Sequence, residues 1–576
     1  MKGAPRSKEF DDIYFSQEDG LAETDFVFLK GNNLPEAWAD SPEFTIAETG
    51  FGTGLNFLAT WKMFEEDALK TPRLNFVSFD KYPLSVNEIK DALEPWAEHF
   101  GGKIQKMLDV YPLRIPGVHS VCVAENVFLT LIFDDVNEAL PKLSGRAVDA
   151  WFLDGFNPAK NPEMWTDNVF ENMARLSRDG ATFATFTAAG FVKRGLQNVG
   201  FDVQKTQGYG RKRERLVGSF SFEDKCKKID TARSVAIIGG GLAGTSAAYW
   251  LKKQGVVPVI YEQGDQLGVG ASGNQRGMVN PRISKLRNGE SDFYMQAYAM
   301  AIREMKVLSE THDIEFEQCG AVHLMHNEDM RARFPSMVAH WGWHEDHARI
   351  VTTKQGHEIS GVEVEQEGLY LPDAATVNPR KLCETYADGV EVFYNTQVSA
   401  IERQGDKWSI DGRLYDGVIL ANALGIKKIA QAWELADKVD LYPVRGQMSL
   451  APETPVSQNI KTILNYRGYL SPALNGIHAL GSTFDREDMD LMLREEDHAE
   501  NVRYLEDAIP SLKGQIAPDG GRAALRVSSK HRFPLYGCVA PNMYVSTAHG
   551  SHGLVSTLQC AAIIHNHLCS CLRVYA

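Results

Sequence analysis

The chain has 576 residues, and because a single hydrophobic core stops growing near ~250–300 residues, we expect at least two domains. Hydrophobic residues make up 44% and charged residues 23%, which is typical of a globular protein and excludes a disordered or fibrous chain. A net charge of −15 disfavours a broad basic surface for nucleic acid, although a local basic patch can override a global sum.

The cysteine pattern and the lengths of the apolar runs indicate the cellular compartment of the protein. The eight cysteines form no CxxC pair, and neither a second pair nor a nearby histidine completes a zinc-site spacing around Cys569 and Cys571. No apolar run reaches the ~18 residues of a membrane span, and the first residues, MKGAPRSKEF, lack the apolar stretch of a signal peptide. We therefore expect a cytoplasmic protein with reduced thiols, no metal and no membrane partner, and we take a monomer as the working expectation.

Two segments have the order strand, glycine-rich loop and helix that opens a doubly wound α/β domain. They are FTIAETGFGTGLNFLATWKMF at 44–64 and SVAIIGGGLAGTSAAYWLKKQG at 234–255. The charged stretch between them, FEDKCKKIDTARS, has no apolar periodicity and is typical of a linker. We predict an α/β chain with a Rossmann-like domain at 1–222, a linker at 223–232 and a second domain at 233–576.

The first glycine loop indicates a nucleotide-type ligand other than a dinucleotide. Glu48 precedes a loop with glycines at every second position, Gly50, Gly52 and Gly54, where the absent Cβ lets a ligand approach the main chain. The spacing is neither GxGxxG nor a phosphate-binding P-loop. An acidic residue before GxGxG suits an adenosine ligand with a positive charge, such as S-adenosylmethionine. The alternative is a turn without function.

Carboxylates end the strands that follow this loop. Asp80 ends the next strand, where a carboxylate can accept both ribose hydroxyls, and Asp134 and Asp135 end the third, within reach of an adenine amino group. Asp154 ends the fourth. The alternatives are that one of the Asp134–Asp135 pair only caps a helix and that Asp154 is a plain loop carboxylate. Four strand ends in register favour a cofactor site, with Glu48, Asp80 and Asp135 as candidate cofactor-binding side chains.

The first domain resembles a known family. EFDDIYFS, GLAETDFVFL, ETGFGTGLNFL, VDAWFLDGFNPAKNPEMW and ATFTAAGFVKRGL, in this order across 9–220, resemble the methyltransferase half of the bifunctional tRNA 5-methylaminomethyl-2-thiouridine biosynthesis family, MnmC. The resemblance implies a methyltransferase that acts on an aminomethyl group of the wobble uridine. It also implies that Asp154 lies beside the amine as orienting group or general base, because the amine must lose its proton before it attacks the methyl sulfonium.

The second loop matches a dinucleotide fingerprint in its proper context. In Gly239, Gly241 and Gly244 the first glycine makes the turn, the second admits the pyrophosphate and the third lets helix and strand pack closely. Glu262 ends the next strand, where it can bind the ribose hydroxyls. The fingerprint alone leaves FAD and NAD open.

Two further segments favour FAD. GVGASGNQRGMVNP follows Glu262 directly, and NMYVSTAHGSHGLVSTLQCAAIIHNHL near the C-terminus is typical of a strand, loop and helix that return to the flavin. The stretch of about 290–520 between them would form an α+β substrate domain. The candidate FAD-binding residues in these segments are Ala271, Ser272, Gly273, Asn274, Gly550, Ser551, Gly553 and Leu554.

The second domain resembles the D-amino-acid-oxidase-like family of FAD enzymes, and more specifically the oxidoreductase half of the same bifunctional family. ASGN, YPVRGQ, GYLSPALNG and HGSHGL match it in order. The resemblance implies that Arg526 binds the substrate carboxylate, whereas the alternative is a surface salt bridge. The chain departs from the oxidase pattern at Arg282, at His531 with Arg532, and at His552, where an apolar residue, an acidic residue and arginine are usual.

The resemblance implies that the two activities act one after the other on tRNA. The flavin half would remove a carboxymethyl group from the wobble uridine side chain, and the methyltransferase half would methylate the amine that is left. The base must leave its loop, and phosphates need lysine and arginine. The candidate RNA-binding residues are Lys193, Arg194, Arg211, Lys212, Arg213 and Arg215, although a charge run can also be a solvated face. Rival hypotheses are a small-molecule amine or amino-acid oxidase with a nucleotide-binding regulatory domain, and a nucleotide sensor without catalysis.

Overall fold

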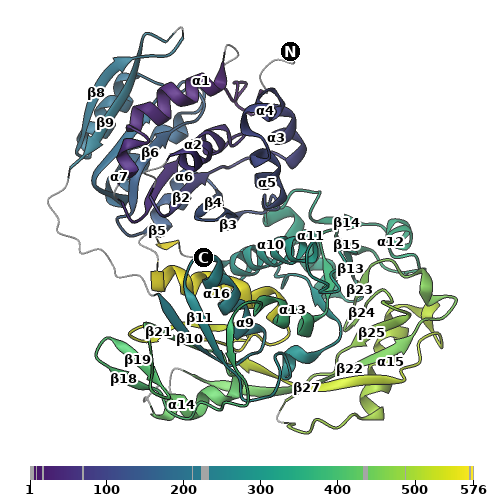
Figure 1. Cartoon of the computed structure of the whole chain (residues 1–576). Coiled ribbons are helices and arrows are strands. Elements are labelled where there is room, and N and C mark those ends of the chain that lie inside the picture. Colours follow the sequence, from purple (N-terminus) through teal and green to yellow (C-terminus); the bar gives the residue numbers. More distant parts are fainter. Residues whose placement is uncertain are drawn as a thin grey trace. The chain divides into compact units, whose positions relative to one another are not determined.

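The chain divides into two compact units, and each is described by itself (Figure 1). The computed structural model describes residues 6–7, 9–15, 19–39, 41–67, 71–210, 212–221, 233–432, 439–486, 488–569 and 573–574. The first unit comprises Met1–Asp230 with Cys569–Ala576, and the second comprises Thr231–Leu568. The predicted linker at 223–232 lies outside the described residues, so the predicted domain limits stay a prediction.

An eight-stranded sheet of order β3-β4-β2-β1-β6-β7-β9-β8 forms the first unit. The five strands from β4 to β7 in this order pair in parallel, so their carboxyl ends meet at one edge of the sheet. The strands are β1 (Phe44–Glu48), β2 (Leu74–Phe79), β3 (Gly117–Ala124), β4 (Val127–Phe133), β6 (Val148–Leu153), β7 (Ser177–Thr185), β8 (Phe201–Gln207) and β9 (Glu214–Phe220). A separate short pair joins β5 (Leu143–Ser144) to β30 (Arg573–Val574).

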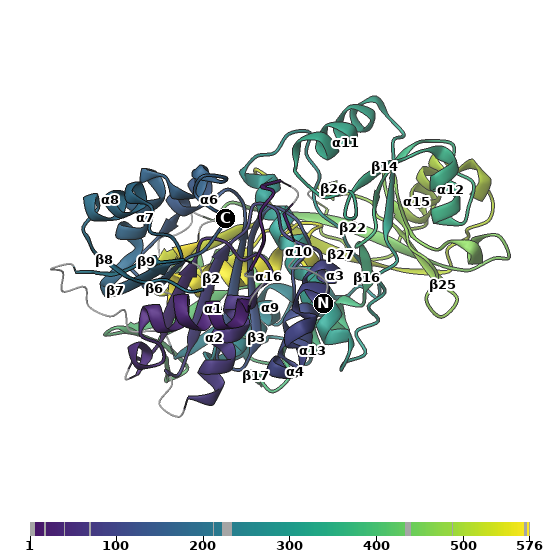
Figure 2. The same cartoon turned by 90° about the horizontal axis from the view of Figure 1, so that it is seen from above.

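Apolar side chains cover both faces of this sheet because neighbouring residues of a strand point to opposite sides. Ile46 and Phe76 pack into one cluster, and Ala47 and Val77 pack into the other. Figure 2 shows α1 and α2 on one side of the sheet and α7 and α8 on the other. The helices are α1 (Gly20–Thr24), α2 (Leu55–Glu66), α3 (Val86–Leu93), α4 (Ala97–Phe100), α5 (Lys103–Asp109), α6 (Val136–Ala139), α7 (Asp167–Leu176) and α8 (Gly190–Asn198).

The second unit opens with a six-stranded sheet of order β17-β11-β10-β21-β29-β28. Its strands are β10 (Ser234–Ile238), β11 (Val257–Tyr261), β17 (Glu391–Phe393), β21 (Gly417–Leu420), β28 (Leu535–Ala540) and β29 (Met543–Thr547). α9 (Leu242–Lys253) follows β10, and α16 (Gly553–Cys569) follows β29. Because β29 pairs with β21 and β21 with β10, the C-terminal part returns to the sheet of the glycine loop.

A nine-stranded mixed sheet is the largest sheet of the second unit. Its two longest neighbours, β22 (Leu441–Pro452) and β27 (Gly520–Ser529), pair antiparallel over their length (Figures 1 and 2). The other strands of this sheet are β13 (Ala321–Leu324), β14 (Arg349–Val351), β15 (Gly368–Leu371), β23 (Ile463–Asn465), β24 (Tyr469–Leu470), β25 (Ile477–Gly481) and β26 (Asp485–Arg486).

Helices and two small sheets complete this unit. The helices are α10 (Gly289–Ser309), α11 (Glu328–His340), α12 (Thr353–Ser360), α13 (Pro379–Tyr386), α14 (Ile426–Ala432) and α15 (Glu495–Ala508). The small sheets join β12 (Gly277–Val279) to β16 (Ala375–Val377), and β18 (Glu402–Gln404) to β19 (Lys407–Ile410) and β20 (Arg413–Tyr415). None of the helices in the described ranges is long and apolar enough to cross a membrane.

The close packing of α9 on β10 gives a test of the second fold. A Cβ on Gly244 would lie 1.8 Å from the Gly239 carbonyl oxygen, so we expect Gly244→Ala to force the helix off the strand. Overpacking of this kind costs roughly 1–3 kcal/mol, and thermal denaturation should show the loss. Gly289→Ala is the matched control, because a Cβ there meets nothing within 4 Å. Equal melting temperatures for the two variants would contradict the prediction.

Candidate active sites

The first glycine loop closes over a cavity of about 520 Å³ at the carboxyl edge of the sheet. Gly50 and Gly52 line this cavity, and Gly52 adopts a φ of +53° that favours glycine. The Gly52 N–H donates to Asp80 Oδ2 at 3.0 Å, and Asp80 Oδ1 accepts from the Tyr82 N–H at 2.9 Å. Burial raises the pKa of Asp80 to about 6. Asp80 therefore lines the cavity and fixes the loop, while its contact with ribose hydroxyls stays a prediction.

Asp154 lies in the same cavity with its carboxylate held from two sides. Oδ1 accepts from the Gly155 N–H at 2.8 Å, and Oδ2 accepts from Asn56 Nδ2 at 2.7 Å. Burial raises the pKa of Asp154 to about 6, while these two hydrogen bonds oppose the rise. A carboxylate with this pKa can take up or hold a proton near neutral pH.

Glu48 acts on this site indirectly, which corrects the prediction that it binds the cofactor. Its side chain is fully buried and absent from the cavity wall. Glu48 Oε1 accepts from Asn56 Nδ2 at 2.8 Å, and Oε2 accepts from Ser78 Oγ at 2.7 Å. Burial, and then the nearby Asp154, raise the pKa of Glu48 well above its ordinary value. Glu48 therefore holds Asn56 from behind the loop.

Asn56 is a site residue that the sequence analysis misses. Thr24 Oγ1 donates to its Oδ1 at 2.7 Å, so the amide nitrogen points at the two carboxylates Glu48 and Asp154. The signal in the sequence is a single polar residue in the apolar first turn of α2. A pattern of residue types cannot tell that this amide reaches a strand end 98 residues away.

The third strand end combines capping with a place in the cavity. Asp135 Oδ1 accepts from the Asn137 N–H at 2.9 Å and caps α6, while Oδ2 bonds Lys81 at 2.9 Å. This is the capping role left open for one of the pair. Asp134 and Asp135 both line the cavity. The contact of Asp135 with the adenine amino group stays a prediction.

The candidate RNA-binding residues separate in the structure. Arg215 is only 8% exposed, its Nη1 donates to the Val27 carbonyl at 2.6 Å, and its guanidinium lies over the Phe26 ring. Arg215 is therefore a packing residue, and its predicted contact with phosphate is wrong. Arg211 lies outside the described residues. Lys212 lines the cavity and pairs with Glu23 at 2.9 Å, Arg213 and Arg194 are exposed, and Lys193 is half-buried.

The second glycine loop borders a larger cavity of about 1210 Å³. Gly239 turns the chain with a φ of +109°, and Gly241 precedes α9, whose first residues line the cavity. Glu262 Oε2 accepts from the Gly240 N–H at 2.6 Å, and Oε1 accepts from the Gly264 N–H at 2.7 Å. Gly244 lies away from the cavity wall and packs the helix on the strand. A helix N-terminus with a carboxylate beside it fits a dinucleotide.

All but one of the other predicted cofactor residues of this unit line the same cavity. Gly273 is outside its wall, because it packs against the Arg522 guanidinium. Ser272 Oγ accepts from the Leu242 N–H at 3.0 Å, which ties this segment to the start of α9. The lining residues are Ala271, Ser272, Asn274, Gly550, Ser551, Gly553 and Leu554.

Arg526 reaches this cavity from β27 and is not a surface salt bridge. Among the residues that the structure describes it has no acidic partner, and its Nη2 donates to Ser482 Oγ. Burial lowers the pKa of Arg526, and the Tyr469 ring stands in the same wall. Gly446 makes room for the guanidinium, since a Cβ there would meet it at 2.4 Å. Ser482, Tyr469 and Gly446 are site residues that the sequence analysis did not single out.

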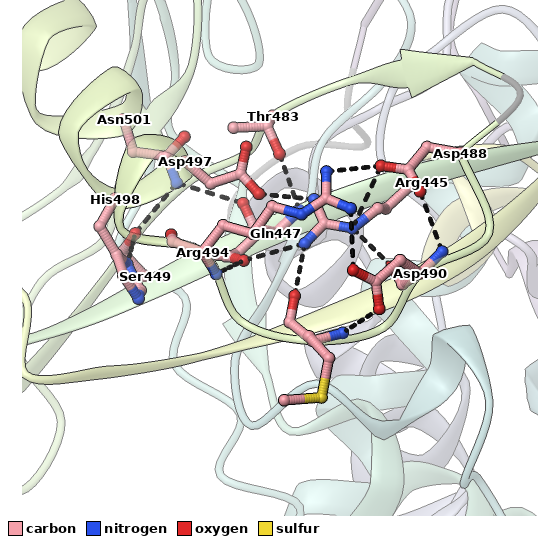
Figure 3. Close-up of polar contacts among 11 residues, drawn as sticks. Arg445, Gln447, Ser449, Thr483, Asp488, Asp490, Arg494, Asp497, His498 and Asn501 are labelled. Atoms are coloured by element: carbon pink, nitrogen blue, oxygen red, sulfur yellow. Dashed lines mark hydrogen bonds and ion pairs between the residues drawn. The ribbon is translucent and has the colours of Figure 1, made fainter.

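Figure 3 shows what the YPVRGQ motif does beside this cavity. Arg445 is 1% exposed in its side chain, and its Nη1 bonds Asp497 at 2.5 Å. Its Nε and Nη2 donate to the carbonyls of Asp490 and Met492 at 2.6 and 2.7 Å. Gln447 accepts from the Arg494 N–H at 2.9 Å and donates to the Arg494 carbonyl at 2.8 Å. The motif therefore fixes the loop that follows Phe484, a residue of the cavity wall.

Two family models match the chain. A S-adenosyl-L-methionine-dependent methyltransferase family matches residues 98–221, and an FAD dependent oxidoreductase family matches residues 234–566. A relative from Idiomarina loihiensis, the tRNA 5-methylaminomethyl-2-thiouridine biosynthesis bifunctional protein MnmC, is 38% identical over 98% of this chain and 94% of its own. The protein of the same name from Aeromonas hydrophila is 35% identical over 98% of this chain and 93% of its own. The chain belongs to the MnmC family.

Membership in the MnmC family confirms the predicted bifunctional enzyme, its fold class and its cofactors, FAD and S-adenosylmethionine. The flavin unit also resembles solved structures. Glycine oxidases from Bacillus cereus and Geobacillus kaustophilus each align with a TM-score of 0.50 over 58% of this chain and 94% of theirs. Their sequence identities of 20% and 18% show a shared fold alone.

Both cavities fit the cofactors of the MnmC family. The charged residues that line the first cavity are mainly acidic, which suits a sulfonium cation, and Asp80, the predicted partner of the ribose hydroxyls, is one of them. The second runs from the loop of Gly239 past Glu262 to Arg526 and His552, which suits a long dinucleotide. Within the described ranges, no group of three or more His, Cys, Asp or Glu side chains is placed to hold a metal ion.

The Arg445 network gives a stability prediction. Arg445→Met leaves Asp497 and two loop carbonyls without their donor, and removal of one partner from a buried ion pair costs about 3–5 kcal/mol. We expect a clear fall in the melting temperature of the flavin unit. Arg331→Met on the exposed face of α11 is the matched control and should melt like the parent. A loss of stability shared by both variants would argue against the network.

The position of Asn56 gives a pH prediction. Methylation should fall as the pH drops through about 6, because Asp154 becomes protonated there. Asn56→Ala removes a hydrogen bond that favours the carboxylate, so the midpoint of this fall should move up by roughly one pH unit. The exposed Asn198→Ala on α8 serves as control. A lower rate with an unmoved midpoint would mean that Asn56 does not position Asp154.

Proposed function

We propose that this protein carries out two consecutive reactions on the wobble uridine of tRNA. The first removes the carboxymethyl group from 5-carboxymethylaminomethyl-2-thiouridine and leaves the aminomethyl form. The second methylates that amine to give 5-methylaminomethyl-2-thiouridine. The observation that carries the proposal is a pair of separate cavities with opposite chemistry, one with an arginine that lacks an acidic partner among the described residues and one with a buried carboxylate.

Arg526 would recognise the carboxylate of the incoming side chain. A guanidinium binds a carboxylate through two parallel hydrogen bonds, and the Ser482 contact of Arg526 holds its orientation. Tyr469 stands beside it and can donate a further hydrogen bond. FAD, when bound, supplies the two-electron oxidation of the carbon–nitrogen bond. Water then adds to the imine of the substrate, and the adduct splits into glyoxylate and the primary amine.

Asp154 would prepare that amine for methylation. S-adenosylmethionine, when bound, supplies the methyl group. A protonated alkylamine has no free lone pair, so the amine must lose a proton before it attacks. Asp154, held by Gly155 and Asn56, can accept or hold this proton, and its raised pKa brings that step close to neutral pH.

The tRNA would present the uridine out of its stack at each cavity. In the first unit Lys193, Arg194, Lys212 and Arg213, together with Arg211, are the proposed contacts to phosphate. Each cavity is lined by residues of one unit, and on that ground we propose that a monomer suffices. Its place of action would be the cytoplasm, where tRNA is modified.

Nucleoside analysis of tRNA from cells that lack the protein tests the proposal. We expect the carboxymethylaminomethyl nucleoside to accumulate, because the first reaction is missing. Purified enzyme should turn over this tRNA in preference to free glycine or sarcosine. Normal methylaminomethyl nucleoside in the deletion strain, or equal turnover of free glycine, would instead favour a small-molecule amine oxidase.

Two single substitutions should separate the two reactions. Asp154→Asn keeps the shape of the side chain but removes the base, so the aminomethyl nucleoside should accumulate with methylation reduced by at least about 100-fold. Arg526→Gln removes the partner of the carboxylate, so the KM of the oxidation should rise while preformed amine is still methylated. Both are read by nucleoside analysis in vitro. Loss of both activities in either variant would contradict the assignment.

A further inference from the structure

Three departures from the oxidase pattern meet in one place on the flavin unit. Arg282 Nη1 donates to the Arg532 carbonyl at 2.9 Å, although the two residues are 250 positions apart. The Arg282 guanidinium lies 5.9 Å from the centre of the Tyr294 ring, and the Tyr294 and His552 rings meet edge to face with their centroids 5.4 Å apart. Arg282, Arg532 and His552, which are far apart in the sequence, thus lie in one local environment.

Four cations gather around this contact, and we call Arg282, Lys285, Lys530 and Arg532 the basic cluster. Lys285 is three residues from Arg282 and Lys530 is two from Arg532, so chain reach keeps each within roughly 11 Å of its neighbour's backbone. Lys285, Lys530 and Arg532 are exposed. No ion pair to these three is found in the described part of the chain, and Arg282 meets Glu290 only at 3.7 Å.

The basic cluster borders the flavin cavity on two chain segments. Asn280 lines the cavity two residues before Arg282, and Val527 lines it three residues before Lys530. The second segment also carries Arg526. The cluster therefore lies close to the wall of the flavin cavity, on the chain segments that supply Asn280 and Arg526.

The positive charge of the basic cluster favours a polyanion as its partner. Like charges held close together repel, and the repulsion is relieved when a polyanion binds. Leu286, 58% exposed between the cationic residues, adds an apolar surface that suits an unstacked base. The loop held by Arg445 offers no such site, since Asp485, Glu495 and Glu496 are exposed there alongside Arg486.

We propose that the basic cluster binds the phosphates that flank the extruded uridine and so guides the RNA loop into the flavin cavity. This inference rests on the proposed function. It gives the flavin unit a phosphate-binding surface of its own, separate from the candidate residues of the methyltransferase unit. If the cluster instead binds an acidic protein, its removal should leave the salt dependence of tRNA binding unaltered.

The test is the salt dependence of tRNA binding by the full-length holoenzyme. The variant K285Q/K530Q/R532N removes three cations, and asparagine tolerates the left-handed φ of 56° at Arg532. The probe is tRNA from cells that lack the protein. The negative slope of the logarithm of the tRNA-binding constant against the logarithm of the salt concentration should become shallower by roughly 2 to 3. The KM of the oxidation should rise, with kcat and flavin absorbance unchanged.

A matched control removes the same charge elsewhere on the flavin unit. K306Q/K354Q/K513Q replaces three exposed lysines, so its slope should equal that of the parent. An unchanged slope in K285Q/K530Q/R532N, or an equal fall in the control, overturns the inference. A parent enzyme that neither binds this tRNA nor oxidises its side chain would instead refute the proposed function, which keeps the two failures apart.

Discussion

A hydrogen bond from a loop glycine to a carboxylate at the end of the second strand organises each half of this protein. The Gly52 N–H bonds Asp80 in the first unit, and the Gly240 N–H bonds Glu262 in the second. In each case the bond closes the turn between strand and helix and leaves the carboxylate at the cavity wall. The two loops differ in spacing and serve different cofactors. The same constraint nevertheless decides where each cofactor site begins.

The strand ends could be predicted from the sequence because they follow a local pattern. Asp80, Asp154 and Glu262 each come directly after a short apolar strand, and parallel strands bring such ends to one edge. The resemblance to the oxidase family predicted Arg526. Its contacts with Ser482 and Gly446 could not be predicted from the sequence, because they depend on pairing between distant strands. Periodicity gives the strands but carries no information on which side chains meet across them.

Burial explains the predictions that the structure corrects. Glu48 was predicted to bind the cofactor and Arg215 to bind RNA, but both side chains are buried inside the first unit. Each is retained there because its polar atoms are satisfied, Glu48 by Asn56 and Ser78 and Arg215 by backbone carbonyls. Sequence alone does not distinguish a charge that meets a ligand from one that supports the backbone. Arg445 belongs to the second kind, although it stands in a motif typical of the family.

β27 connects features of the flavin unit that have been described separately. Arg522 donates to the carbonyls of Val269 and Gly270, Arg526 lines the flavin cavity, and Lys530 follows the end of the strand. These residues are spaced by four, so Arg522 and Arg526 share one face of an unbroken ladder with β22. At about 3.3 Å per residue, the strand separates Arg522 from Arg526, and Arg526 from Lys530, by about 13 Å each. One extra residue between Arg522 and Arg526 would place the two arginines on opposite faces of the strand. The two side chains could then no longer contact the carbonyls of Val269 and Gly270 and the flavin cavity at the same time.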